Sequence, residues 1–308
     1  MNILLTGAAG QVGFELHRTL SPLGELTVTT RDGRLPGGMA CEALDLSRPA
    51  DLSATLDRLR PDVLVNPAAY TAVDRAESEP ELARRVNTEA VEAMAHWCAG
   101  YGALFVHYST DYVFSGEGGR AWTEADPTAP LGVYGSSKRD GELALIASGA
   151  RHLIFRTAWV YAARGGNFLR TMLRLAGERD SLAVVDDQVG APTPARWIAS
   201  ASAAVLARLH DVGRDVPASA LFHLAAGGQT SWHGFAAAIM ARATAAGLLQ
   251  KAPALRAISS ADYPTAARRP ACSTLDTSHL ARCHGLRLPD WSQGLDQVIV
   301  ELAAAAPH

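Results

Sequence analysis

Apolar runs that suit buried strands alternate along the first half of the chain with stretches whose apolar residues recur at helical spacing. The expected strands lie at 2–6, 25–30, 59–70, 103–114 and 152–161. The helical patterns between them lie at 49–60, 79–100 and 133–148. Because parallel strands need a crossover that is usually a helix, this alternation predicts an α/β fold with a doubly wound parallel sheet.

The turn after the first expected strand, GAAGQVG at 7–13, has glycines at G-x-x-G-x-x-G spacing. Glycine lets a pyrophosphate come close to the backbone, and the following helix offers free N–H groups at its positive end. A glycine-rich turn can also be purely structural, but the strand–turn–helix context favours a dinucleotide. The sequence therefore predicts a Rossmann-type domain with Gly7, Gly10 and Gly13 at the cofactor.

Beyond residue 160 the alternation becomes less regular. We expect helices at 166–178, at 194–209 and from Ser231, strands at 181–186 and 219–224, and a loop at 259–270. These elements predict a dinucleotide-binding domain at 1–160, to which 190–224 return, and a smaller substrate-binding lobe that makes up most of 161–308.

The end of the second expected strand bears on which nicotinamide nucleotide would bind. NAD-preferring folds tend to place an acidic residue there, which binds the ribose 2′-OH. Here the strand ends in Arg31, a cation that suits a 2′-phosphate and favours NADPH, although Asp32 follows directly and leaves NADH as the alternative. Asp45, after the next short apolar segment, lies either beside the adenine or in an ordinary loop.

Tyr134 and Lys138 lie four positions apart in VYGSSKRDGE and share one face of the helix expected there. Of the 28 lysine and arginine residues, only Lys138 and Lys251 are lysines. Bringing a tyrosine pKa from about 10 to neutrality takes about 4 kcal/mol. A lysine about 4 Å away supplies a similar energy at an effective dielectric constant of about 20. We therefore expect Lys138 to tune the Tyr134 phenol and to hold ribose hydroxyls.

Ser109 and Thr110 stand near the end of the strand expected at 103–114. A carbonyl under reduction needs a hydride on carbon and a proton on oxygen. Tyr134 can act as the general acid, and the Thr110 hydroxyl can donate a hydrogen bond to the substrate oxygen as charge develops. Hydroxyl residues are common near strand ends, but beside the tyrosine and lysine they predict a catalytic set of Thr110, Tyr134 and Lys138.

Composition and charge narrow the classes of partner. The chain has 308 residues, of which 48% are apolar and 19% charged, an ordinary globular composition. The net charge of -3 gives no electrostatic reason to expect nucleic acid or a membrane surface, so the expected partner is a small molecule. The 4 cysteines are scattered, the chain opens directly into MNILLTG, and no apolar run approaches the roughly 20 residues of a membrane-spanning helix. We expect a cytoplasmic protein.

Longer motifs add a resemblance to a known family. They are NPAAYTAVDRAESEPELA (66–83), HYSTDYVFSG (107–116), PLGVYGSSKRDGE (130–142), FRTAWVY (155–161), DDQVGAPT (186–193) and SADYPTAARRP (260–270). Together with the glycine turn and the catalytic set, they resemble the extended short-chain dehydrogenase/reductase superfamily, and within it the dTDP-4-dehydrorhamnose reductase family. The resemblance covers essentially the whole chain.

The resemblance implies transfer of a hydride from NADPH, with NADH as the alternative, to a dTDP-linked 4-keto sugar. The product would be dTDP-β-L-rhamnose, a precursor of rhamnose-containing polymers such as the lipopolysaccharide O-antigen. Tyr134 would protonate the new alkoxide. The residues implied at the sugar nucleotide are Thr110, Asp111, Trp159, Asn167, Phe168 and Arg269. Those implied at the cofactor are Gly10, Gln11, Val12, Asp45, Leu46, Ala69, Tyr70, Thr71, Tyr108 and Lys138.

One position departs from the family pattern. Some members are dimers bridged by a metal between acidic side chains, and Glu15 fits such a site. The position that aligns in the following helix is Arg196, whose charge argues against that metal. A second cluster, made up of Cys272, His279, Cys283 and His284, lacks the paired spacings of zinc ligands. We expect no metal, and either a monomer or a homodimer.

Two other functions stay open at this stage. A nucleotide-sugar epimerase or dehydratase of the same superfamily would return its hydride, and dehydratases typically carry an Asp–Glu pair after the threonine. Here Tyr112 follows Asp111, which favours net reduction. A non-catalytic, NADP-binding regulatory subunit would share the fold, and the complete set of Thr110, Tyr134 and Lys138 favours an enzyme instead.

Overall fold

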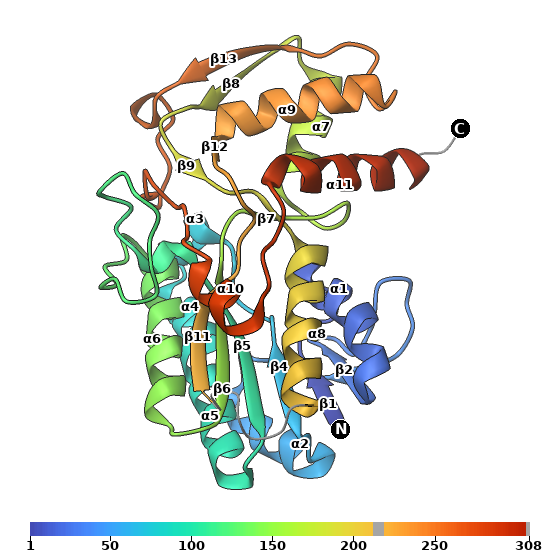
Figure 1. Ribbon diagram of the computed structural model, residues 1–308, viewed down its shortest axis with the longest axis vertical. Helices are drawn as coiled ribbons and strands as arrows, with labels where there is room; N and C mark the ends of the chain where they lie inside the picture. Colours follow the sequence, from blue (N-terminus) through green and yellow to red (C-terminus); the bar gives the residue numbers. More distant parts are fainter. Residues whose placement is uncertain (212–218, 306–308) are drawn as a thin grey trace.

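A parallel sheet of seven strands forms the lower part of the molecule in a computed structural model, which describes residues 1–211 and 219–305 (Figure 1). The strand order is β11-β6-β5-β4-β1-β2-β3, and every neighbouring pair is parallel. The strands are β1 (Asn2–Leu5), β2 (Glu25–Thr30), β3 (Glu42–Ala43), β4 (Val63–Asn66), β5 (Leu104–Thr110), β6 (His152–Thr157) and β11 (Ser219–His223). The predicted doubly wound parallel sheet is confirmed.

Successive side chains of the central strands enter two different cores, one on each face of the sheet. Ile3 and Leu5 pack with residues of α1 (Gln11–Leu20) and α8 (Ala195–Asp211). Leu4 packs with residues of α2 (Leu52–Leu59) and α5 (Ala90–Tyr101). Burial on both faces explains why these strands are continuously apolar in the sequence.

Helix α6 (Val133–Ala147) lies against α5, and three short elements pack beside it. These are α3 (Val73–Ala76), α4 (Pro80–Arg84) and one π-helical turn (Arg85–Glu89). Close packing requires glycine on α6, because a Cβ at Gly135 would lie 2.2 Å from the Tyr112 carbonyl oxygen. The position of this helix is therefore fixed from several sides.

The glycine turn that joins β1 to α1 packs closely against Ala68 and against its own backbone. Gly7 has a φ of +59°, and a Cβ there would lie 2.8 Å from the Cβ of Ala68. A Cβ at Gly13 would lie 2.1 Å from the carbonyl oxygen of Gly7. These two glycines therefore have a packing requirement of their own, beside the cofactor role predicted for them.

A smaller lobe covers one end of the sheet (Figure 1). Strand β6 runs through Trp159 into β7 (Val160–Tyr161), which pairs with β10 (Thr193–Pro194) at this end. The lobe therefore covers the carboxyl ends of the strands. Its other elements are α7 (Phe168–Glu178), α9 (Trp232–Ala245), α11 (Trp291–Ala305), the pair β8 (Ser181–Val185) and β13 (Ala254–Ile258), and the pair β9 (Val189–Gly190) and β12 (Thr230–Ser231).

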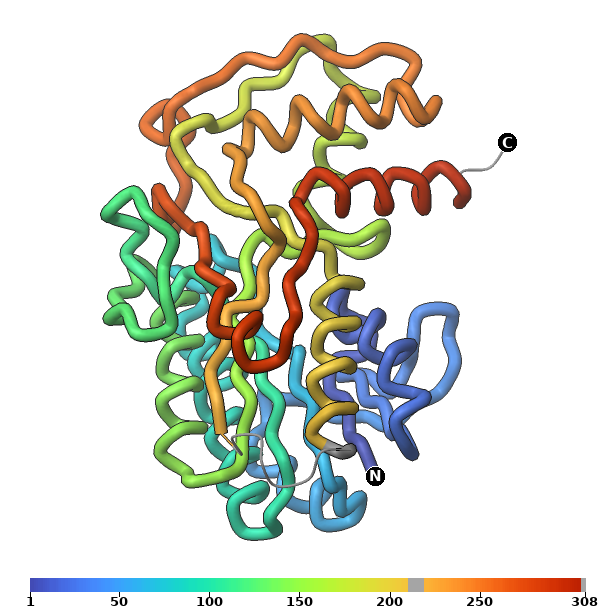
Figure 2. The backbone as a smooth tube through the Cα atoms, in the orientation of Figure 1, coloured from blue at the N-terminus to red at the C-terminus, as the bar shows by residue number. Residues whose placement is uncertain are grey.

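The chain passes repeatedly between the sheet and the lobe (Figure 2). Helix α8 and strand β11 return to the sheet, and α10 (Ser278–His284) packs beside β11 before α11 returns to the lobe. The ranges 190–224 and 161–308 include residues 212–218 and 306–308, which lie outside the described residues. No helix in the described part of the chain is both long enough and apolar enough to cross a membrane.

Three expected strands are shorter than their apolar patterns. The pattern at 59–70 yields only β4, which is bracketed by Pro61 and Pro67, residues that cannot donate to a strand ladder. The pattern at 103–114 ends at Thr110, because a 3-10 turn begins at Asp111. The pattern at 152–161 is interrupted at Trp159, whose φ of 49° lies in the left-handed region. The last two interruptions fall beside the candidate active site.

Candidate active site

The three residues of the predicted catalytic set come together at the lobe-facing end of the sheet. Thr110 is the last residue of β5, and Tyr134 and Lys138 lie on the first turns of α6. The Thr110 hydroxyl acts on the Tyr134 phenol by lowering its pKa, and Thr110 and Lys138 are both buried. The arrangement provides two hydroxyl groups and an ammonium group in one sheltered place.

Lys138 points into the interior beside β5. Its Nζ donates a hydrogen bond of 2.6 Å to the carbonyl oxygen of Tyr108 and lies 3.2 Å from Nε2 of His107. Burial lowers the pKa of Lys138 to about 8, although the charge of Glu142 acts in the opposite direction. Burial also holds the pKa of His107 well below its ordinary value, so its imidazole is neutral.

The environment of Tyr134 bears on the expected role of Lys138. Burial raises the pKa of Tyr134 to about 12, while a hydrogen bond with Thr110 acts to lower it. The ammonium group of Lys138 is bonded to Tyr108 and His107 in this structure. The tuning of the phenol by Lys138 stays a prediction.

Asp111 follows Thr110 directly and shares its hydrogen bonds. Thr110 Oγ1 donates to Asp111 Oδ1 at 2.8 Å and accepts from the backbone N–H of Tyr112 at 3.2 Å. Burial raises the pKa of Asp111 to about 6, against the lowering effect of hydrogen bonds from Ser273 and Thr110. A carboxyl group is thus connected to the phenol through one hydroxyl.

Two residues that sequence reasoning did not single out hold the start of α6. Glu77 Oε1 accepts a hydrogen bond of 2.8 Å from the backbone N–H of Val133, 56 positions away. Asn87 donates to Ser137 Oγ at 3.0 Å across 50 positions, and it also binds the backbone of Tyr70. Both lie in or just after the motif at 66–83, but no local pattern marks residues that act on a helix so distant in sequence.

The predicted cofactor residues lie along the same end of the sheet. Helix α1 begins at Gln11 without a side-chain cap and without an acidic residue in its first turn, so its free N–H groups suit a phosphate. Arg31 is exposed just after β2. Asp32, the alternative ribose ligand, is occupied locally, because its Oδ1 accepts from Thr30 Oγ1 at 3.0 Å and from the Arg34 N–H at 3.3 Å.

Other predicted cofactor residues are bonded within the protein. Asp45 accepts from the Ser47 N–H at 2.9 Å, and Leu46 is buried in the core shared with α2. The hydroxyl of Tyr70 donates to Glu79 at 2.6 Å, and that of Tyr108 donates to Ser202 at 2.8 Å. With Ala69 and Thr71, these tyrosines can therefore offer a cofactor their backbone rather than their hydroxyl groups.

A cavity of about 860 Å³ lies in the lobe, next to the catalytic set. It is bounded by side chains of α7, β8 and β13 and by the segment at 260–269. Tyr112 lines it and packs edge-on against Tyr134, with 5.6 Å between ring centroids. A ligand in this cavity would therefore reach the catalytic set past Tyr112, a residue that the sequence analysis did not select as a ligand contact.

The residues expected at a sugar nucleotide divide into two groups. Phe168 and Arg269 line the cavity, and Arg269 is held by Asp74 of α3 through bonds of 3.0 and 2.6 Å. Trp159 stacks on Trp232 with ring centroids 3.5 Å apart, and only Trp232 lines the cavity. Asn167 caps α7 and donates to Gln11 Oε1 at 2.9 Å, so it joins the lobe to the glycine turn.

The positions considered for metals have other contacts. Arg196 Nη2 donates to Glu301 Oε2 at 2.5 Å, while Glu15 is buried on α1. His284 packs against Phe222, and Cys272 lies against the Arg120 carbonyl. Within residues 1–211 and 219–305, no three His, Cys, Asp or Glu side chains gather as a metal site.

Comparison with known proteins identifies close relatives. The family model described as RmlD substrate binding domain matches residues 1–304. The chain is 48% identical over 303 residues to a dTDP-4-dehydrorhamnose reductase from Shigella flexneri, covering 98% of each. It is similar to the structure of a dTDP-4-dehydrorhamnose reductase from Clostridium acetobutylicum, with a TM-score of 0.85, 32% identity, and coverage of 98% of this chain and 99% of the other. A structure of the Bacillus anthracis reductase in complex with NADP has a TM-score of 0.83 and 30% identity, and covers 97% of this chain and 99% of the other.

Proposed function

The chain belongs to the RmlD substrate binding domain family, and from this we propose that it reduces the C4 ketone of dTDP-4-dehydrorhamnose to dTDP-β-L-rhamnose with NADPH. The observation that supports this most directly is the position of Tyr134. It lies on the first turn of α6 and packs against Tyr112, which follows Thr110 by two residues and lines the lobe cavity. In this proposal residues 1–160 with 190–224 bind the cofactor, and most of 161–308 binds the sugar nucleotide.

The N–H groups at the start of α1 would bind the pyrophosphate of the cofactor, and Arg31 its 2′-phosphate. Lys138 would hold the nicotinamide ribose, because it is a buried cation one helical turn from Tyr134. NADPH supplies the hydride when bound. The presence of NADP in the Bacillus anthracis relative supports this choice of nucleotide over NADH.

Tyr134 would donate its proton to the oxygen of the reduced ketone. A phenol with a pKa of about 12 is still protonated at neutral pH, and an alkoxide is a stronger base than its phenolate. Thr110 and Asp111 would contact the sugar, and Trp159 would pack against it. Arg269 would bind the diphosphate in the cavity, with Phe168 beside the nucleotide and Asn167 holding the lobe to Gln11.

The test supplies dTDP-4-keto-6-deoxyglucose together with a 3,5-epimerase and follows NADPH oxidation and the formation of dTDP-rhamnose. We expect one NADPH to be consumed for each product molecule, and we expect Tyr134→Phe to abolish turnover while the variant still binds NADPH. Consumption of the keto sugar without net NADPH oxidation would favour an epimerase. Nucleotide binding without any turnover would favour a regulatory subunit.

The remaining features of the proposal concern partners and location. The net charge of -3 supports a small-molecule substrate rather than nucleic acid or a membrane surface. Free cysteines at four scattered positions support a reducing, cytoplasmic environment. The Arg196–Glu301 ion pair supports a monomer or a homodimer that needs no bridging metal.

A further inference from the structure

Thr110 has three hydrogen-bond partners, and its hydroxyl group can serve them in two different ways. A hydroxyl has one proton to donate and two lone pairs that accept. The backbone N–H of Tyr112 occupies one lone pair at 3.2 Å. One proton and one lone pair then remain to be shared between Asp111, at 2.8 Å, and the Tyr134 phenol.

The protonation state of Asp111 decides how they are shared. An ionised carboxylate can only accept, so Thr110 must donate to it, and the proton of Tyr134 then turns toward Thr110 and away from a substrate. A protonated Asp111 donates to Thr110, and Thr110 in turn donates to the phenol oxygen. The O–H of Tyr134 is then free to point at the ketone.

We propose that Asp111 is the proton source that reprotonates Tyr134 through Thr110, an inference that rests on the proposed reductase function. The Tyr134 O–H bond breaks as the proton passes to the alkoxide left by the hydride. The Thr110 proton passes to the phenolate, and the Asp111 proton passes to Thr110. One alkoxide is protonated, Asp111 becomes a carboxylate, and both hydroxyl groups regain their protons. Asp111 takes up a proton from solvent before the next turnover.

The surroundings of Asp111 favour its protonated form. The residue is 3% exposed, and its Oδ2 has no partner with hydrogen-bond geometry among the described residues. Burial raises its pKa to about 6, and a bound diphosphate would raise it further through like charge. The titratable groups facing it are Tyr112 on its own turn and Tyr134 on α6, with Lys138 one turn farther along. The Arg269–Asp74 pair lies beyond Tyr112.

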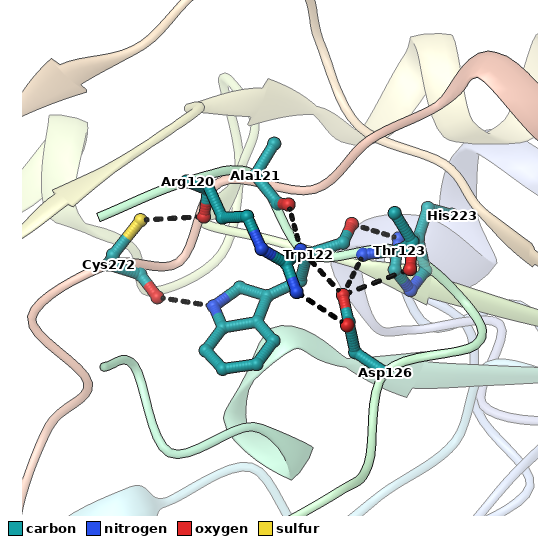
Figure 3. A network of polar contacts seen from close by, with 7 residues as sticks. All are labelled: Arg120, Ala121, Trp122, Thr123, Asp126, His223 and Cys272. Atoms are coloured by element: carbon teal, nitrogen blue, oxygen red, sulfur yellow. Dashed lines mark hydrogen bonds and ion pairs between the residues drawn. The ribbon is translucent and has the colours of Figure 1, made fainter. Parts of the chain in front are cut away.

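Ser273 approaches the same carboxyl group from a separate segment, and Figure 3 shows what holds that segment in place. Trp122 Nε1 donates to the carbonyl oxygen of Cys272 at 3.0 Å, directly before Ser273. The carbonyl of Trp122 accepts from Nδ1 of His223, at 3.0 Å, and the Arg120–Asp126 ion pair closes the loop that carries Trp122. Because His223 has a pKa of about 3 through burial, this anchor stays neutral and does not titrate with Asp111.

The test is stopped-flow NADPH oxidation by the full-length protein and its Asp111→Asn variant across pH 5 to 9, with the epimerised keto sugar as substrate. An asparagine amide can donate to Thr110 but cannot give up a proton. We therefore expect the variant to oxidise one NADPH per site in a burst, followed by turnover about 10²-fold slower than in the unchanged protein. The unchanged protein should show no such burst, and its kcat should fall about tenfold per pH unit above the pKa of Asp111. This fall of kcat at high pH is the alkaline limb of the pH profile. In the variant the alkaline limb should be absent.

A second variant tests the inference if Asp111→Asn fails to fold, which loss of NADPH binding would show. Ser273→Ala removes a hydroxyl group that acts to lower the pKa of Asp111, so the alkaline limb should move to higher pH. An unmoved limb in Ser273→Ala would overturn the proposal. So would an Asp111→Asn variant that shows no burst, keeps the limb and changes only the KM of the sugar nucleotide. If the unchanged protein oxidises no NADPH with this substrate, the proposed function itself has failed.

Discussion

The ammonium group of Lys138 lies 3.2 Å from Nε2 of His107, and both side chains are closed off from solvent. A charged lysine can only donate, so Nε2 is the unprotonated nitrogen and Nδ1 carries the hydrogen. Nδ1 faces the side-chain amide of Asn66 at 3.3 Å, and Asn66 in turn contacts the Thr6 hydroxyl at 2.5 Å. The backbone of Asn66 supplies the acceptor for this imidazole N–H, while Asn66 Oδ1 accepts from Thr6 Oγ1. This chain ties Lys138 to the strand that leads into the glycine turn.

Replacing His107 should therefore disturb Lys138 without touching a ligand. In His107→Leu, Lys138 keeps the Tyr108 carbonyl as its one acceptor among the described residues, and losing a hydrogen bond to a charged group costs about 1.5–3 kcal/mol. We expect a lower free energy of unfolding in urea and a higher Kd for NADPH. His107→Gln, which keeps an acceptor, should recover part of both. Equal effects of the two substitutions would show that the loss comes from packing alone.

Glu142 and Arg156 form a buried ion pair behind Lys138. The carboxylate accepts from Arg156 Nε at 2.9 Å and from Nη2 at 2.6 Å, with both side chains 5% exposed or less. Glu142→Gln leaves the buried guanidinium without its counter-charge, which we expect to cost about 3–5 kcal/mol in chemical denaturation. The exposed pair of Arg174 and Glu178 is the matched control, because Glu178→Gln should cost less than about 1 kcal/mol.

The same variant should change how NADPH binding depends on pH. Glu142 acts to raise the pKa of Lys138, which burial lowers to about 8, so removing its charge should lower that pKa further. Lys138 would then lose its proton at a lower pH. Binding that needs the ammonium should weaken above pH 8 in the unchanged protein and at lower pH in Glu142→Gln, as titrations of nicotinamide fluorescence would show. A coincident pH dependence in the two proteins would contradict this.

Glu77 should matter to catalysis although it touches neither predicted ligand. Its carboxylate caps α6 at Val133, one residue before Tyr134. Loss of a cap costs about 0.5–2 kcal/mol, and fraying of this turn would misplace the phenol. We expect Glu77→Ala to lower kcat more than it changes the KM for NADPH. Glu81→Ala removes an exposed carboxylate on the neighbouring helix α4 and should leave kcat unchanged; an equal loss in both variants would refute the capping role.

The sequence was most informative where function depends on neighbours along the chain. The glycine turn, Arg31 and the Tyr134–Lys138 spacing are local patterns, and the strands and helices that carry them lie close to where the patterns predict. The partners of Lys138 could not be predicted, because His107, Tyr108 and the buried Glu142 reach it through the fold. The cap from Glu77 was missed for the same reason, since it joins segments 56 positions apart.

Arg31 provides a test of cofactor preference. Asp32 is bonded to Thr30 and to the Arg34 backbone, which leaves the Arg31 side chain as the charged group offered at the end of β2. Loss of a charge-assisted hydrogen bond to the 2′-phosphate corresponds to about a 10–100-fold weaker interaction. We expect Arg31→Gln to raise the KM for NADPH by this factor and to leave that for NADH unchanged. Lys251→Gln, which removes the same charge from an exposed position in the lobe, should change neither.

Arg269 and Asp74 connect the lobe segment at 260–269 to helix α3. Asp74 also accepts from the Ala267 N–H at 3.1 Å, so it fixes both the backbone and the guanidinium that lines the cavity. If Arg269 binds the diphosphate, Arg269→Gln should raise the KM of the sugar nucleotide about 10–100-fold, and Asp74→Asn, which loosens the arginine without removing it, should raise it less. The KM for NADPH should stay constant in both. Arg268→Gln is the control, because this exposed neighbour also lines the cavity but is not held by Asp74. A larger effect of the Arg268 substitution than of the Arg269 substitution would show that Arg268, and not Arg269, contacts the diphosphate.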